Sequence, residues 1–68
     1  MEYRKLIKIK DVCAITKLSR ATIYRKQQAG DFPSAIQLSV RSVAWYADEI
    51  EVWLGSRPRS VNADAANI

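Results

Sequence analysis

The run SRATIYRK, Ser19 to Lys26, decides how this chain folds, because it opens a helix with hydroxyl and basic side chains. Ser19 is a suitable N-cap, since its hydroxyl can accept hydrogen bonds from the free backbone amides of the next turn. Further along, Gly30 suits the left-handed residue that ends many helices, and Pro33 cannot continue a helix. The run therefore predicts a helix over about 20–29.

A shorter helix is predicted just upstream, over about 10–16. Val12, Cys13 and Thr16 are spaced to share one face, with Ile15 at its edge. Two short helices with a tight joint between them are typical of helix-turn-helix proteins, in which the second helix lies in the major groove of DNA.

The next segments alternate with period two, which predicts a two-stranded hairpin. Its strands are AIQLS at 35–39 and SVAWY at 42–46, separated by Val40 and Arg41. The turn lacks the usual Asn-Gly pair, so the sequence does not define its geometry. The lead-in at 6–10 also alternates, and it fits either a strand or an extended arm.

A third helix is predicted to start near Ala47 or Asp48, where acidic residues suit the positive end of the helix dipole. Its apolar face, together with the expected aromatic core, comprises Tyr46, Ile50, Trp53, Leu54, Phe32 and Trp45. The order helix, helix, two-stranded wing, helix predicts a mainly α winged helix-turn-helix with a small β-hairpin over residues 1–57. Residues 58–68 are predicted to form a flexible tail, because they contain almost no large apolar side chains.

Length and charge restrict the function. A chain of 68 residues has room for one small domain with a modest core, in which an enclosed active site is hard to build. Its net charge is +4, but residues 1–46 carry nine basic and three acidic side chains, whereas residues 47–68 carry two basic and four acidic ones. A positive field over the helix pair favours a polyanionic partner such as double-stranded DNA, although surface charge also serves solubility.

Catalysis is disfavoured by the residue types present. The chain has no histidine and one cysteine, Cys13, which excludes an intrachain disulfide and a thiolate metal site. We expect Cys13 to be a small core residue, with a reactive thiol as the alternative. Asp48 and Glu51 are helix neighbours, but a dipole role explains them more simply than a paired-carboxylate site. We expect no enzyme activity, no cofactor, no metal and no small-molecule substrate.

The sequence also predicts where the protein works. No apolar run approaches membrane-spanning length, and the first ten residues lack a signal-peptide core. We therefore expect a soluble protein of the cytoplasm without a membrane partner.

The helix predicted over 20–29 supplies most of the candidate DNA contacts. Ile23 must face inward, so the first turn projects outward, where arginine can bond guanine and threonine can contact a base edge. The Tyr24 phenol either reaches a phosphate or belongs to a partly buried core ring. The full candidate set is Lys17, Ser19, Arg20, Thr22, Tyr24, Arg25 and Lys26 from the helix pair, with Arg41 and Ser42 from the hairpin.

Two simpler interpretations stand beside these assignments. The cluster can be an ordinary capped surface helix with solvated charges, because helix-turn-helix patterns have false positives. Arg41 at the hairpin tip can enter a minor groove or pair with a phosphate, or it can be an exposed turn arginine.

Taken together, the motifs resemble a known family. DVCAIT-x-LSRATIYR, AGDFP, and AW followed by DEIEVWL are similar to the AlpA-type phage and prophage regulators, relatives of the MerR-like winged-helix excisionases, over about residues 5–57. The resemblance implies a bacterial, nucleoid-associated protein that regulates transcription or bends DNA as an excisionase, with integrase or further copies of itself as partners. By position, Ser19, Arg20, Thr22, Tyr24 and Arg25 match the family's recognition helix, and Arg41 falls in its wing.

Two residues depart from the family pattern. Lys17 stands where relatives commonly have glycine, so we expect a left-handed backbone there at some strain. Gln27 stands where an apolar residue usually follows Ile23 by one turn, which leaves the inner face of this helix incomplete. An excision-specific architectural role, or a protein-interaction role of the third helix and tail, for example on integrase, remains open.

Overall fold

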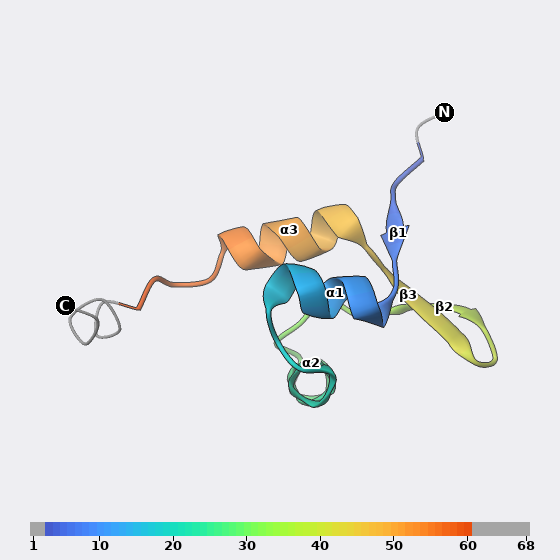
Figure 1. Ribbon diagram of the computed structural model, residues 1–68, viewed down its shortest axis with the longest axis horizontal. Helices are drawn as coiled ribbons and strands as arrows, with labels where there is room; N and C mark the ends of the chain where they lie inside the picture. The colour runs from blue at the N-terminus through green and yellow to red at the C-terminus, as the bar shows by residue number, and fades with distance from the viewer. Residues whose placement is uncertain (1–2, 61–68) are drawn as a thin grey trace.

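The computed structural model describes residues 3–60. Its elements are β1 (Leu6–Ile7), α1 (Ile9–Thr16), α2 (Arg20–Gln28), β2 (Ile36–Ser39), β3 (Ser42–Tyr46) and α3 (Ala47–Gly55) (Figure 1). The predicted winged helix-turn-helix, mainly α with a small β-hairpin, is confirmed. Most of the predicted flexible tail lies outside the described residues, which end at position 60.

The joint between α1 and α2 depends on two residues with special backbone roles. Lys17 has φ 64° and ψ 18°, the left-handed conformation predicted for it, and its N–H donates to the Cys13 carbonyl at 2.8 Å. Ser19 is extended, and its Oγ accepts from the Thr22 amide at 3.2 Å, as a predicted N-cap should. The chain consequently turns sharply, and Figure 1 shows α2 end-on below α1, which runs across the picture.

The lead-in is a strand rather than a free arm. β1 pairs antiparallel with β3, which places Leu6 opposite Tyr46 and Ile7 opposite Trp45. The sheet therefore has three strands in the order β1-β3-β2, one more than the predicted ribbon. β2 and β3 form the predicted hairpin, with a register irregularity between Gln37 and Ser39.

One small core joins the three helices to β1 and β3. It consists of Ile7, Val12, Ile23, Phe32, Trp45 and Ile50. The Trp45 indole N–H donates to the Pro33 carbonyl at 3.1 Å, and the Trp53 indole N–H donates to the Asp31 carbonyl at 3.0 Å. Phe32 meets Trp53 edge-on, with ring centroids 4.6 Å apart. The loop between α2 and β2 is thereby fixed, and with it the position of the wing relative to α2.

Two helix boundaries differ slightly from their expected places. α1 begins at Ile9, because the Lys8 carbonyl already accepts from the Val12 amide at 3.0 Å. α2 ends at Gln28, and Gly30 follows with φ 76°, the left-handed conformation expected of it.

The inner face of α2 is as incomplete as its sequence indicates. Ile23 is its one buried residue. Gln27 is half-buried, and its Oε1 is buried without a hydrogen-bond partner in the described part of the chain. The attachment of α2 to the core therefore depends mainly on Ile23 and on the partly buried Leu18 just before the helix.

The N-terminal arm is clipped to the start of α3. Arg4 donates from Nε and Nη2 to the two carboxylate oxygens of Asp48, both at 2.9 Å, and Nη2 also reaches Glu49 at 3.3 Å. Its guanidinium lies 3.7 Å from the centre of the Tyr46 ring. The hydrogen bonds from Arg4 lower the pKa of Asp48 below its usual value.

Candidate nucleic-acid interface

A hydroxyl network arranges the first turns of α2. The Ser19 hydroxyl donates to Thr22 Oγ1 at 2.9 Å, and Arg25 Nη2 donates to the same oxygen at 3.1 Å. Three residues of the predicted site are therefore brought together. The Arg25 guanidinium is drawn back toward the N-terminal turn, where its remaining N–H groups stay available.

The arginines on this surface are not neutralised by the protein itself. Arg20, Arg25 and Arg41 are all exposed. None of them belongs to an ion pair with any residue between 3 and 60. Their charge is therefore available to an external anion.

Lys26 lies beside Thr22 and Arg25 but is also paired within the protein. Its Nζ lies 3.5 Å from the Asp31 carboxylate and 6.0 Å from the centre of the Trp53 ring. Arg57 approaches the same two groups, at 3.4 Å from Asp31 and 4.5 Å from the ring centre of Trp53. Lys26 is thus shared with an intramolecular cluster at the end of α3.

Tyr24 lies on the flank of α2 that faces the hairpin. It is 43% exposed and does not belong to the core cluster. With Gln28 and Ser34 it lines a hollow of about 450 Å³ between α2 and the hairpin. Of these three residues, only Tyr24 was predicted from the sequence to belong to the site.

The wing presents one arginine at its tip, and a lysine from outside the hairpin holds the residue that follows it. Arg41 sits in the turn beside Val40, which is 93% exposed. Directly after the turn, at the first residue of β3, Lys8 Nζ donates to the Ser42 hydroxyl. Ser42 is therefore half-buried and already bonded, and Lys8, which was not among the predicted site residues, is the residue that holds it.

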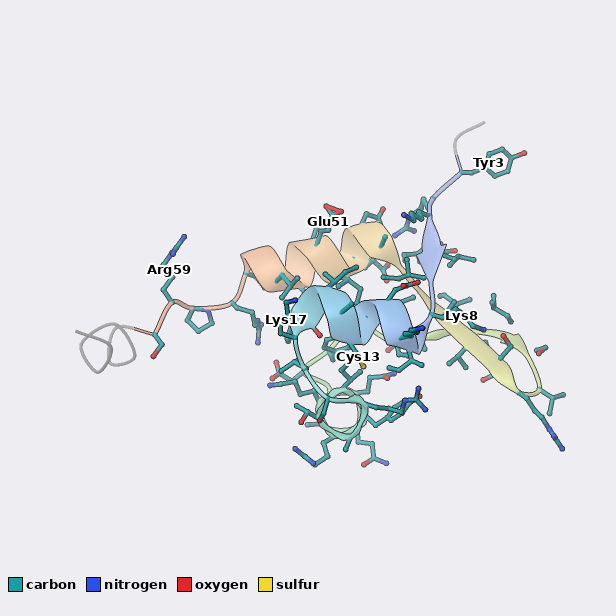
Figure 2. All side chains as sticks on the ribbon, viewed as in Figure 1. Tyr3, Lys8, Cys13, Lys17, Glu51 and Arg59 are labelled. Atoms are coloured by element: carbon teal, nitrogen blue, oxygen red, sulfur yellow. The ribbon has the colours of Figure 1, made fainter. Side chains whose placement is uncertain are left out.

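The two ends of α1 carry lysines, as Figure 2 shows for Lys8 and Lys17. Lys17 is exposed at the turn into α2, next to the hydroxyl network. Cys13 is partly buried and packs against the core, in agreement with the expected core role.

Acidic side chains gather on another side of the molecule. Asp48, Glu49 and Glu51 all lie on α3, and α1 separates α3 from α2 in Figure 1. Figure 2 shows Glu51 directed away from α1 and α2. The acidic residues of α3 thus lie apart from the exposed arginines of α2 and the wing, whereas Asp31 lies beside Lys26 of α2.

Metal-binding clusters and membrane spans are absent from the described range. Residues 3–60 contain no group of three or more Cys, Asp or Glu side chains placed to hold a metal ion. No helix in that range is long and apolar enough to cross a membrane.

The comparisons with known proteins agree with this architecture. Residues 5–58 match the family model described as "Prophage CP4-57 regulatory protein (AlpA)". The chain belongs to the AlpA family of prophage regulatory proteins. The match begins just before β1 and extends past the end of α3, so it includes the helix pair and the wing.

One relative comes from Enterobacteria phage P4. The chain is 32% identical to its "Uncharacterized protein ORF88" over 53 residues. The aligned part covers 78% of this chain and 60% of the phage protein, so the chain spans about 60% of the length of that relative.

Proposed function

We propose that this AlpA-family protein binds duplex DNA sequence-specifically, as a regulator carried by a prophage or integrative element. Helix α2 enters the major groove, and the wing reaches the adjacent minor groove or the backbone beside it. The observation that supports this most is the exposure of Arg20, Arg25 and Arg41 without any ion pair within residues 3–60. The site of action is the bacterial cytoplasm, at the nucleoid.

The hydroxyl network gives α2 a specific task in this proposal. Because Thr22 holds Arg25 in place, the guanidinium loses less conformational freedom when it bonds O6 and N7 of a guanine. Arg20 is the second candidate for a base edge. The free backbone amides of the first turn, which Ser19 caps, take a phosphate, and Lys17 and Arg41 take others.

A single module of this size binds modestly. Such modules bury about 600–1,000 Å² of protein surface on DNA. Contacts to about five phosphates give a slope near −4.5 for the logarithm of the binding constant against the logarithm of salt concentration. Further copies bound to neighbouring sites, or an integrase bound beside the protein, raise the fraction of DNA sites that are occupied.

Footprinting tests the proposal directly. The protein should protect repeats in the attachment region or the integrase promoter of its host element, and bend that DNA. Arg25→Ala should abolish protection, whereas Arg59→Ala, which removes the same charge from the segment after α3, should leave it intact (Figure 2). The absence of a protected site in both regions would refute the proposal.

Transcriptional control and excision are two uses of the same domain. As an excisionase, the protein directs an integrase toward excision by bending the attachment site. As a regulator, it changes the integrase transcript level. An excision assay with and without the protein, scored beside integrase transcripts, separates the two roles.

An interaction role for α3 is the second candidate function, and one observation favours it. Val52 is 72% exposed beside an open hollow of about 720 Å³, which Trp53, Pro33 and Ile36 also line. If Arg20→Ala with Arg25→Ala keeps activity in cells while Val52→Asp loses it, this candidate replaces DNA binding.

A further inference from the structure

The hollow between α2 and the hairpin is lined entirely by neutral side chains. They are Tyr24, Gln27, Gln28, Ser34, Ala35, Gln37 and Val43. Cations lie around it instead: Arg20 precedes Tyr24 by one helical turn, and Arg41 sits at the hairpin tip. A surface proposed to bind a polyanion therefore has an uncharged strip between its positive groups.

Three exposed hydrogen-bonding groups in this strip are unused, and the half-buried Gln27 amide is a fourth group without a partner within residues 3–60. The Tyr24 phenol, the Gln28 amide and the Ser34 hydroxyl make no side-chain hydrogen bond within residues 3–60, and Gln28 and Ser34 are exposed. Gln37 differs, because its amide donates to the carbonyls of Ser39 and Val40. The strip thus offers three exposed free donors from two parts of the fold.

The geometry of duplex DNA brings one strand over this strip. A major groove and the adjacent minor groove are separated by a single sugar–phosphate backbone. If α2 occupies the first groove and the wing reaches the second, that backbone must cross the surface between them. The surface between α2 and the hairpin is this hollow.

We propose that Tyr24, Gln28 and Ser34 form a neutral clamp that hydrogen-bonds the phosphodiester backbone between the two grooves. This proposal rests on the proposed function, and it assigns the residues of one contact between the protein and the DNA backbone. Tyrosine, glutamine and serine are regular donors to DNA phosphates, and such contacts fix register rather than read sequence. Since these donors carry no charge, they release no counterions when they bind.

This last property gives the clamp a distinctive signature. Its removal weakens DNA binding without changing the salt dependence. Removal of an arginine weakens binding and also flattens the log–log salt slope, by about 0.9 for each phosphate that the arginine had neutralised.

The test uses a mixed-sequence duplex of about 30 base pairs, because backbone contacts act on any sequence. Binding is titrated at several salt concentrations for the wild type, for Tyr24→Phe/Gln28→Leu/Ser34→Ala, for Arg25→Ala and for Tyr3→Phe. We expect the triple variant to bind at least roughly tenfold more weakly at an unchanged slope, since each of the three neutral hydrogen bonds is worth about 0.5–1.5 kcal/mol. Tyr3→Phe, a matched loss of a phenol at a residue that is 88% exposed on the N-terminal arm, should bind as the wild type does.

A gain-of-function variant covers the case in which the triple variant fails to fold. Gln28→Lys adds one charge to the hollow, so binding should strengthen several-fold and the slope should steepen by about 0.9. Tyr3→Lys adds the same charge at the N-terminal arm and should change the slope much less.

The possible outcomes separate the two proposals. If neither the wild type nor any variant binds the duplex, the proposed function fails and the clamp fails with it. If Arg25→Ala loses binding while the triple variant, or Gln28→Lys, behaves as the wild type, only the clamp is overturned. A triple variant with a flattened slope would also overturn it.

Discussion

Lys17 holds the turn of the helix pair in a conformation that glycine adopts more easily. Its φ of 64° is unfavourable for a residue with a Cβ, by roughly 1 kcal/mol. The side chain is exposed beside the N-terminal turn of α2, where the proposed DNA backbone passes. A strained lysine at this place is therefore consistent with a role in binding rather than in folding.

Lys17→Gly should change stability and binding in opposite directions. Relief of the strain should raise the melting temperature by about 4–8 °C for a domain of this size, because that is the shift that roughly 1 kcal/mol produces. Loss of the charge should weaken DNA binding and flatten the salt slope. Thermal unfolding by circular dichroism and duplex titration measure the two effects.

Lys17→Asn is the matched control for this experiment. Asparagine tolerates the left-handed region and carries no charge, so binding should weaken as in the glycine variant. If Lys17→Gly lowers the melting temperature, the turn does not store the inferred strain.

At the residue scale, the sequence predicts what depends on near neighbours. The Ser19 cap and the left-handed Gly30 were predictable because each follows from a local backbone requirement, and the left-handed Lys17 was implied by the family resemblance, since relatives commonly have glycine there. The ion pair of Lys26 with Asp31 joins α2 to the loop that follows it. It depends on the conformation of that loop, which the local sequence does not specify. The hydrogen bond from Lys8 to Ser42 joins residues 34 positions apart, so a local sequence pattern cannot predict it.

At the scale of elements, α2 exposes Arg20 and Arg25 and buries only Ile23 against the core. Gln27 occupies its inner side with a buried Oε1 that lacks a partner among residues 3–60. An unsatisfied buried polar atom is unfavourable by about 1–3 kcal/mol. Stability therefore has room to increase at this position.

Gln27→Leu should raise the free energy of unfolding by about 1 kcal/mol, because it removes that atom and extends the apolar side begun by Ile23. Duplex binding should change much less than in Tyr24→Phe/Gln28→Leu/Ser34→Ala, since Gln27 is half-buried and is not one of the three exposed donors of the hollow. Chemical denaturation measures the first effect. Gln28→Leu, the same change at an exposed neighbour, should leave stability unaltered, and a destabilised Gln27→Leu would contradict the inference.

The ion pair between Arg4 of the N-terminal arm and Asp48 of α3 should make the stability of the fold depend on pH. Hydrogen bonds from Arg4 lower the pKa of Asp48, so the folded state is favoured where this carboxylate is ionised. The stabilisation is present above the usual aspartate pKa of 3.8 and is lost as the pH falls through the lower value of the folded state.

Arg4→Met should therefore lower the melting temperature slightly at neutral pH. The difference from the wild type should shrink below about pH 4 and disappear once Asp48 is protonated in both states. The effect is small, because Arg4 and Asp48 are both about half-exposed and solvent screens their attraction. A difference that is constant from neutral to acid pH would mean that Arg4 acts by packing on Tyr46 alone.

For the whole molecule, the order of the elements was predictable and their lateral arrangement was not. Periodicity identified three helices and a hairpin, because each pattern lies within one segment. β1 pairs with β3, a strand almost forty positions away in the sequence. A strand of two residues is too short for its alternation to predict which strand it pairs with. The neutral hollow was missed for the same reason, since α2 and the hairpin contribute to it separately.

The charge segregation of the whole molecule leads to a last prediction, about salt. Asp48, Glu49 and Glu51 lie on α3, whereas Arg20, Arg25 and Arg41 on α2 and the wing have no ion pair within residues 3–60. DNA on α2 and the wing should therefore meet mainly positive charge, with Asp31 paired to Lys26 and Arg57. Contacts to about five phosphates give a slope near −4.5, which weakens binding about 500-fold between roughly 50 and 200 mM salt.

Titrations across this salt range test how many charges the surface uses. Lys17→Gly and Arg41→Ala should each flatten the slope by about 0.9, because each of these residues holds one phosphate in the proposed complex. Arg57→Ala should not, because its guanidinium is committed to Asp31 and Trp53. A wild-type slope flatter than about −2 would show that α2 and the wing do not engage one duplex together, because either element alone supplies too few cations for the proposed five contacts.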